Sequence, residues 1–351
     1  MSVARWPLVA LILLALPVLA AAAEPLRRIA FGSCASQERP QPIWDAVIAT
    51  KPEVFLFLGN TIYADTDNAD VLKAKYAQLA AVPGYQKLLQ TCPLVYATWD
   101  DHDYGTPDAG ADFPNKAASQ KAFLDFFREH AESPRRKREG VYVALQFGTE
   151  GRRVQIILLD TRYFRSPLKR TATGLAASTD PAATILGEKQ WKWFEDQLRL
   201  PADLRLIGSS IQVVAEEHPF EKWMNFPAER ERLFKLLRDT KASGVVFLSG
   251  NRQLAELSQM DAGLGYPLFD LTSSGLNMGN RRWRPADPNR HRVDTMTNGD
   301  NFGLVTIDWD QSPPQVSLQV RDVNGEVAFQ QKLGLATLQP GSLKPSAAVV
   351  S

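Results

Sequence analysis

The stretch Leu94-Val-Tyr-Ala-Thr-Trp-Asp-Asp-His-Asp-Tyr-Gly105 decides the predicted fold. It begins as a short apolar run with β-branched and aromatic residues, which is typical of a buried strand. It ends in four consecutive ionisable residues, from Asp100 to Asp103, which we predict to lie in a loop. Taken alone, these four residues are better explained by a solvated acidic turn. At the carboxyl end of a strand in an α/β protein, however, they suit metal-binding or acid–base chemistry.

Three further predicted strands carry polar residues to the same edge. The strands span residues 28–33, 54–58 and 245–248, and they are followed by Cys34, by Gly59-Asn60 and by Ser249-Gly-Asn251-Arg-Gln253. Up to Gly105, predicted strands alternate with predicted helices, which indicates right-handed crossovers and a parallel sheet. The sequence therefore predicts an α/β fold in which these side chains converge.

The composition indicates one globular domain. The chain has 351 residues, of which 44% are hydrophobic and 23% charged, and its formal net charge is +1. Such a balance gives no electrostatic reason to expect a nucleic-acid partner. Nothing in the sequence indicates an oligomeric state.

The first 23 residues are predicted to be a secretory signal peptide. Arg5 precedes an apolar run from residue 6 to 20, and small residues then offer cleavage frames before Glu24. We therefore expect a bacterial protein that is secreted or periplasmic and has no membrane contact after cleavage. The predicted domain spans residues 24–338, and residues 339–351 are predicted to form a loose tail.

The two cysteines, Cys34 and Cys92, are predicted to stay unpaired. Cys34 follows its strand, whereas Cys92 precedes the strand that begins at Leu94. If the two strands are parallel, about six residues at ~3.3 Å each separate the thiols. That separation exceeds the reach of a disulfide.

Several loops carry residues whose function the sequence leaves open. Residues 167–180 show no regular pattern, and His218 suits a solvated position as well as a functional one. The basic run from Arg135 to Arg138 is best interpreted as a solvated face. Residues 280–292, which are rich in arginine, are better interpreted as a solvated loop than as a cover for a phosphate site.

Together, the motifs resemble the PhoD-like alkaline phosphatase/phosphodiesterase family of the calcineurin-like metallophosphoesterase superfamily. The motifs are Phe31-Gly-Ser-Cys34, Gly59-Asn60-x-x-Tyr63-Ala-Asp65, Trp99-Asp-Asp-His-Asp-Tyr-Gly105, Asp160-Thr-Arg-Tyr-Phe-Arg165, Gln190-Trp191 and Leu271-Thr-Ser-Ser-Gly275. The resemblance implies a four-layer α-β-β-α sandwich of two mixed sheets flanked by helices. It also implies a binuclear metal centre of iron and/or calcium at the strand ends.

The resemblance also assigns roles to individual residues. It implies metal-ligand positions at Cys34, Asn60, Tyr63, Asp101, Asn251 and Gln253, catalytic groups at His102 and Asp103, and substrate contacts at Arg162 and Arg252.

Three of the implied metal positions depart from the family pattern. Asn60 and Asn251 stand where the family has aspartates, and Gln253 stands where it has a histidine. Two multivalent cations a few ångströms apart repel each other, and anionic ligands hold such a pair together. An amide oxygen is neutral and a weaker donor, and glutamine offers no imidazole nitrogen to a transition metal.

Three hypotheses follow. In the first, the chain is an exported pseudoenzyme, inactive or weakly active, that binds a phosphoester-type small molecule or a lipid head group in the old cleft. In the second, it is an active metal-dependent phosphatase or phosphodiesterase with a rebuilt or single-metal site. The ligands of that site would come from Cys34, Tyr63, Asp65, Asp100, Asp101 and His102. In the third, it is a structural or interaction protein that uses another surface.

Overall fold

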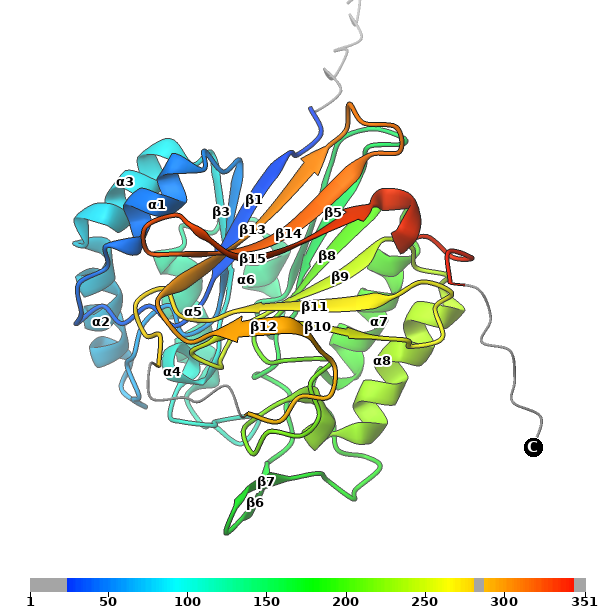
Figure 1. Ribbon diagram of the computed structural model, residues 1–351. Coiled ribbons are helices and arrows are strands. Elements are labelled where there is room, and N and C mark those ends of the chain that lie inside the picture. The colour runs from blue at the N-terminus through cyan, green and yellow to red at the C-terminus, as the bar shows by residue number, and fades with distance from the viewer. Residues whose placement is uncertain (1–23, 281–286, 344–351) are drawn as a thin grey trace, which may run out of the picture.

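The computed structural model describes residues 24–280 and 287–343, in which two mixed sheets face each other (Figure 1). The first sheet has the order β15 (Val327–Gly334), β14 (Gln315–Asp322), β13 (Asn301–Asp308), β1 (Arg28–Gly32), β2 (Val54–Leu58) and β3 (Leu94–Thr98). The second has the order β12 (Arg292–Thr297), β10 (Ala255–Met260), β11 (Leu268–Ser273), β9 (Val245–Ser249), β8 (Leu204–Ser209), β5 (Val154–Leu158) and β4 (Val143–Phe147).

Helices cover the outer faces of both sheets. The first sheet is covered by α1 (Ile43–Ala49), α2 (Ala69–Ala80), α3 (Pro83–Thr91) and α5 (Lys116–Phe126), and the second by α7 (Gly187–Leu198) and α8 (Pro227–Asp239). Shorter elements are α4 (Asp101–Tyr104), α6 (Pro134–Lys137), η1 (Trp223–Asn225), η2 (Leu335–Leu338) and a hairpin of β6 (Lys169–Thr171) and β7 (Gly174–Ala176).

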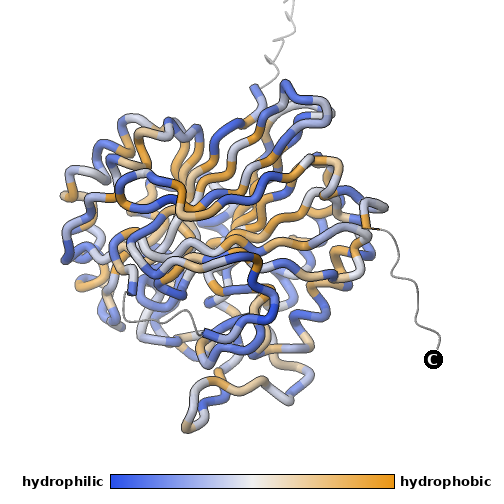
Figure 2. Tube along the Cα trace, viewed as in Figure 1, coloured by the Kyte–Doolittle hydropathy of each residue, from blue (hydrophilic) through white to orange (hydrophobic). Residues whose placement is uncertain are grey.

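The alternation of side chains along β2 shows how the layers form. Val54, Leu56 and Leu58 belong to the core between the two sheets, whereas Phe55 and Phe57 pack under the helices of the first sheet. Successive side chains of a strand point to opposite faces, so a strand buried on both faces is apolar throughout. Figure 2 shows hydrophobic segments gathered along the central strands. The predicted four-layer sandwich of two mixed sheets is therefore confirmed.

The local predictions have mixed outcomes. The predicted parallel pairing of β1, β2 and β3 is confirmed, and β13, β14 and β15 pair antiparallel. The prediction that residues 167–180 lack regular structure is wrong because they contain β6 and β7. The predicted loop from Asp101 to Tyr104 is also wrong, since it forms the one-turn helix α4.

Other predictions concern the cysteines and the ends of the chain. Cys34 and Cys92 are free and buried, as predicted. The predicted signal peptide and residues 344–351 lie outside the described residues. Within the predicted tail, the backbone N–H groups of Gly341 and Leu343 donate to the carbonyl of Gly265. None of the helices in the described ranges is long and apolar enough to cross a membrane.

Candidate functional site

Five strand ends meet at one edge of the two sheets. Cys34 follows β1, Asn60 follows β2, Asp100 follows β3, and Asn251 and Gln253 follow β9, while Ser274 follows β11. Cys34, Asn60, Asn251 and Gln253 all have left-handed backbone, with φ between 51° and 68°. Such conformations are uncommon for residues other than glycine, and they cluster at functional sites.

Gly59 lets β2 approach the acidic motif closely. Its φ is +91°, and a Cβ at this position would lie 2.4 Å from the Cβ of Asp100. A side chain could therefore not be accommodated without moving the backbone. The glycine brings Asn60 and Asp100 into contact.

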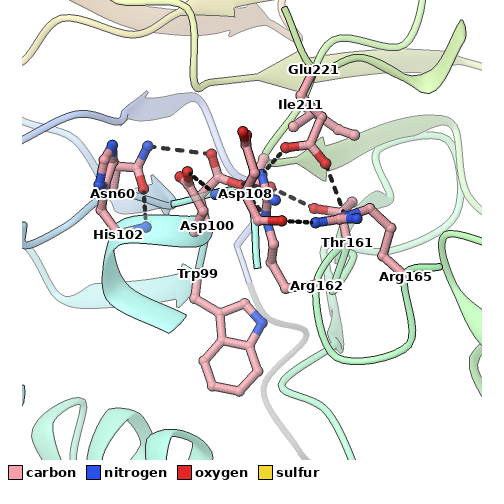
Figure 3. Close-up of polar contacts among 12 residues, drawn as sticks. Asn60, Trp99, Asp100, His102, Asp108, Thr161, Arg162, Arg165, Ile211 and Glu221 are labelled. Atoms are coloured by element: carbon pink, nitrogen blue, oxygen red, sulfur yellow. Dashed lines mark hydrogen bonds and ion pairs between the residues drawn. The ribbon is translucent and has the colours of Figure 1, made fainter. Parts of the chain in front are cut away.

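A buried guanidinium holds Asp100. Arg162 has no exposed surface, and its Nε donates to Asp100 Oδ1 at 2.6 Å while its Nη2 donates to Glu221 at 2.5 Å (Figure 3). Arg165 Nε lies 3.0 Å from the other oxygen of Glu221. Ser210 also donates to Asp100, at 2.8 Å. Burial raises the pKa of Asp100, and Arg162 opposes that change.

The amide of Asn60 turns its nitrogen toward this carboxylate. Asn60 Oδ1 accepts the backbone N–H of His102 at 3.2 Å, which fixes the orientation of the amide (Figure 3). Asn60 Nδ2 then donates to Asp100 Oδ2 at 3.3 Å. The N–H group of Asn60 therefore points to the place where a bridging carboxylate would direct an oxygen ligand at a metal.

Asp103 lies behind the acidic motif. It is fully buried, and it accepts backbone N–H groups of Asp100 at 2.6 Å, Thr61 at 3.0 Å and Asn60 at 3.3 Å. Burial raises its pKa to about 6, although these hydrogen bonds oppose the change. These hydrogen bonds join the two loops through Asp103, and its catalytic role stays a prediction.

His102 forms a charged pair at the surface of the site. Its Nδ1 lies 2.5 Å from Asp65 Oδ1, and its ring lies against Tyr63 with the ring centroids 4.3 Å apart. Burial lowers the pKa of His102, but the hydrogen bond to Asp65 and the charge of Asp101 outweigh burial and raise it to about 9. His102 is therefore an imidazolium at neutral pH.

We expect Asp65→Asn to lower the pKa of His102 by about 1–3 pH units, because the substitution removes an adjacent opposite charge. The chain has 4 histidines, so ¹⁵N NMR titration can follow each ring, and His102→Gln identifies the relevant resonance. The folded pKa exceeds the ordinary value near 6.5. The pair therefore stabilises the fold fully below about pH 6.5, and that contribution is lost as pH rises through about 9. An unchanged pKa in Asp65→Asn would contradict this assignment.

The thiol of Cys34 lies in the interior of the site. Cys34 Sγ lies 3.2 Å from Ser274 Oγ and 3.9 Å from Asn60 Nδ2. Burial raises the pKa of Cys34, so the group is a thiol rather than a thiolate near neutral pH. Ser274 Oγ also accepts the backbone N–H of Gln253 at 2.9 Å, which links β11 to the loop after β9.

The donor set does not fit a binuclear metal centre. In the described ranges, no three His, Cys, Asp or Glu side chains are grouped so that they could hold a metal ion. The amide nitrogen of Asn60 faces Asp100, and Arg162 already neutralises that carboxylate. A cation brought to this position would meet a donor N–H group and a nearby guanidinium, both of which oppose it.

Two buried oxygens of the site are weakly partnered. Within the part of the chain that the structure describes, Asp101 Oδ1 and Tyr63 Oη meet no partner at good hydrogen-bond geometry, although Asn60 lies near Asp101, and Cys34 and Gln253 lie near the phenol. Asp101 Oδ2 accepts the backbone N–H of Asp108 at 2.9 Å. Burial raises the pKa of Asp101, but Arg162 and His102 outweigh burial and lower it, so Asp101 is ionised.

A cleft of about 570 Å³ opens beside these residues. It is lined by Asp108, Arg170, Thr171, Thr173, Gly174, Leu175, Pro219, Phe220, Glu221, Asn251, Arg252 and Gln253. Its volume lies in the range of small-molecule sites. Asn251, Arg252 and Gln253 therefore border a space that a ligand can enter.

The two arginines predicted to contact substrate are placed differently. Arg252 lines the cleft and pairs with Asp287 at 2.7 Å, so its position agrees with contact to a ligand. Arg162 is fully buried between Asp100 and Glu221, so it stabilises the site from behind and does not reach a ligand. Glu221 was not predicted, because nothing in the local sequence relates it to Arg162.

His218 also differs from a solvated loop residue. It is 1% exposed, and burial together with the charges of Arg252 and Lys222 lowers its pKa well below the ordinary value. Of the basic run, Arg135 is buried and donates to the carbonyls of Val141 and Ala97. Hence this arginine supports the fold instead of forming a solvated face.

The fold is shared with solved phosphatase structures. A dimetal phosphatase from Danio rerio has the same fold, with a TM-score of 0.52 at 12% identity over 89% of this chain and 100% of its own. The sequence model of the PhoD-like phosphatases matches residues 29–274. The chain therefore belongs to the PhoD-like phosphatase family.

Two other solved structures share the fold. The structure of PhoD has a TM-score of 0.71 at 17% identity, covering 91% of this chain and 72% of that one. GAP50, described as the anchor in the inner membrane complex of Plasmodium, has a TM-score of 0.56 at 12% identity and 89% coverage of both chains. No curated protein matches this sequence.

Proposed function

We propose that this chain is an exported PhoD-like pseudoenzyme that hydrolyses phosphoesters weakly or not at all. It binds a phosphoester-type small molecule or lipid head group in the former catalytic cleft. The observation that carries the proposal is the orientation of Asn60, whose amide nitrogen donates to Asp100. Export belongs to the proposal because residues 1–23 have the composition of a signal peptide.

The remaining side chains supply binding but little catalysis. Metal ions in phosphoesterases lower the pKa of a bound water and polarise phosphoryl oxygens. Asn60, Asn251 and Gln253 can do neither, because neutral amides only exchange hydrogen bonds with a ligand. The imidazolium of His102 and the guanidinium of Arg252 favour an anionic ligand by charge.

A non-hydrolytic role is compatible with this fold. GAP50 shares it and is described as an anchor, which is a role other than phosphoester hydrolysis. The same scaffold can carry different functions at its strand ends. We therefore place ligand binding ahead of catalysis for this chain.

A second candidate is an active phosphatase with a single metal ion. It is favoured by the buried oxygens Asp101 Oδ1 and Tyr63 Oη, which meet no partner at good hydrogen-bond geometry within the described residues. A carboxylate and a phenol oxygen would be the ligands of one hard cation, and the nearby Cys34 would add a softer ligand only as a thiolate. Such an ion would lower the pKa of one bound water.

Elemental analysis of the purified mature protein tests the proposal. We expect well below one ion per chain after incubation with iron, calcium, manganese or zinc. Addition of a chelator should leave the melting temperature unchanged, since a ligand that binds only the folded state would raise it. One or more tightly held ions, together with turnover of bis(4-nitrophenyl) phosphate, would overturn the proposal in favour of the single-metal candidate.

A further inference from the structure

Phe220 is an unusual surface residue at the rim of the cleft. It is 43% exposed, and it is the only aromatic side chain among the large exposed hydrophobic residues of the described ranges. It lines the cleft together with Leu175 and Pro219. An exposed apolar surface next to convergent polar groups is typical of a ligand site.

The ring of Phe220 is held in place by its neighbours. The guanidinium of Arg252 lies over the ring, 4.6 Å from its centroid, and Asp287 holds the guanidinium at 2.7 Å. Arg252 itself is only 3% exposed. Because the neighbours already hold the ring before binding, the Phe220 side chain loses little conformational entropy when a ligand stacks on it.

The hairpin of β6 and β7 forms a second part of the cleft lining. Leu175 donates its backbone N–H to the carbonyl of Pro219 at 2.8 Å, which ties the hairpin to the Phe220 loop. A Cβ on Gly174 would lie 2.5 Å from Pro219, so the contact is close. Arg170 on the same hairpin pairs with Asp108 at 2.6 Å. These contacts join the hairpin to the rest of the cleft.

The cleft offers both polar and apolar groups to a ligand. Asn251, Arg252 and Gln253 supply hydrogen-bond donors for phosphoryl oxygens, whereas Phe220 and Leu175 supply an apolar surface. We infer that the ligand is a phosphoester whose substituent is an aromatic ring, and that this ring stacks on Phe220 while the phosphoryl group contacts the loop after β9. The inference rests on the proposed function, since it specifies the ligand of the same cleft.

Calorimetric titration with phenyl phosphate, methyl phosphate and inorganic phosphate tests the inference. We expect phenyl phosphate to bind about tenfold more tightly than methyl phosphate, because ring stacking adds to the burial of apolar area. Phe220→Ala should remove that advantage, so that phenyl phosphate and methyl phosphate bind the variant with equal affinity. Leu89→Ala is the matched control, because Leu89 on α3 is also 43% exposed.

Each outcome has a distinct meaning. If all three compounds bind with equal affinity, or Phe220→Ala leaves phenyl phosphate binding unchanged, the aromatic subsite is wrong and the proposed phosphoester site stands. If none binds, the proposed ligand class fails and the subsite fails with it. Because Phe220 is exposed, we expect the variant to keep the native melting temperature, which a thermal scan verifies.

Discussion

The combined substitutions Asn60→Asp, Asn251→Asp and Gln253→His should give this chain bound metal and raise its hydrolysis of bis(4-nitrophenyl) phosphate by about 10³-fold. The physical reason is that the three changes supply the anionic and imidazole ligands that a pair of cations needs. A thousandfold gain corresponds to about 4 kcal/mol of transition-state stabilisation, which metal activation of a water can supply. The measurements are metal stoichiometry and initial rate.

The single variant Asn60→Asp tests what one added carboxylate does when no metal is bound. Without metal, it places a second carboxylate against Asp100, in place of the donor at 3.3 Å. We expect it to lower the free energy of unfolding by about 1–3 kcal/mol and to give no gain in rate. Asn324→Asp makes the same chemical change beside Asp322 in the exposed turn between β14 and β15, where solvent screens the two carboxylates, so it should lower the free energy of unfolding by less than about 1 kcal/mol and leave the rate unchanged.

The triple variant can fail in an informative way. If it is folded but gains neither metal nor rate, the three amides are not what prevents catalysis. If the unaltered protein already hydrolyses the diester in the absence of added metal, the proposal of a pseudoenzyme is wrong. Circular dichroism of every variant establishes that each is folded before rates are compared.

The strand pattern predicted most of the scaffold. Val54 to Leu58 is apolar at every position, and only a strand buried on both faces requires that pattern. Such a strand continues into the turn that carries Asn60, so the position of the site followed from the sheet. In contrast, strands β10 and β12 were not predicted, because their short, polar segments show no clear period-two alternation.

The partners inside the site could not be predicted from the sequence. Arg162 and Glu221 are 59 residues apart, and only the packing of two loops brings them together. The same is true of Asp65 and His102, which are 37 residues apart. Sequence motifs identify residues that a catalytic or binding reaction requires. An ion pair that only stabilises the fold has no characteristic separation in the sequence, so no motif reveals it. The protonation state of His102 was therefore unpredictable as well.

Two residues of the site have an uncommon backbone conformation. Cys34 and Gln253 have left-handed φ values of 59° and 54°, which residues other than asparagine and glycine seldom adopt. Such conformations cost free energy unless the surrounding structure imposes them. The packing of the strand ends therefore imposes these turns, which the local sequence does not predict.

Arg162→Met should be the most destabilising single substitution in the site, lowering the free energy of unfolding by about 3–5 kcal/mol. Arg162, Asp100 and Glu221 have at most 1% exposed side-chain surface, so removal of the guanidinium leaves Asp100 without a cation away from water, whereas Glu221 keeps Arg165. Urea titration measures the loss. Arg170→Met is the control, because the Arg170–Asp108 pair is 64% and 27% exposed and should contribute less than about 1 kcal/mol.

A second variant distinguishes lost charge compensation from lost packing. Combining Arg162→Met with Asp100→Asn removes the uncompensated charge and leaves the Arg165–Glu221 pair intact, and we expect it to recover at least half of the lost stability. A loss below about 1 kcal/mol in Arg162→Met, or no recovery in the combined variant, would contradict this account. The guanidinium of Arg162, and not a metal ion, compensates the charge of Asp100. The free energies of unfolding measured by urea titration should therefore be the same with and without a chelator. A chelator-dependent difference would instead identify a bound cation as part of the compensation.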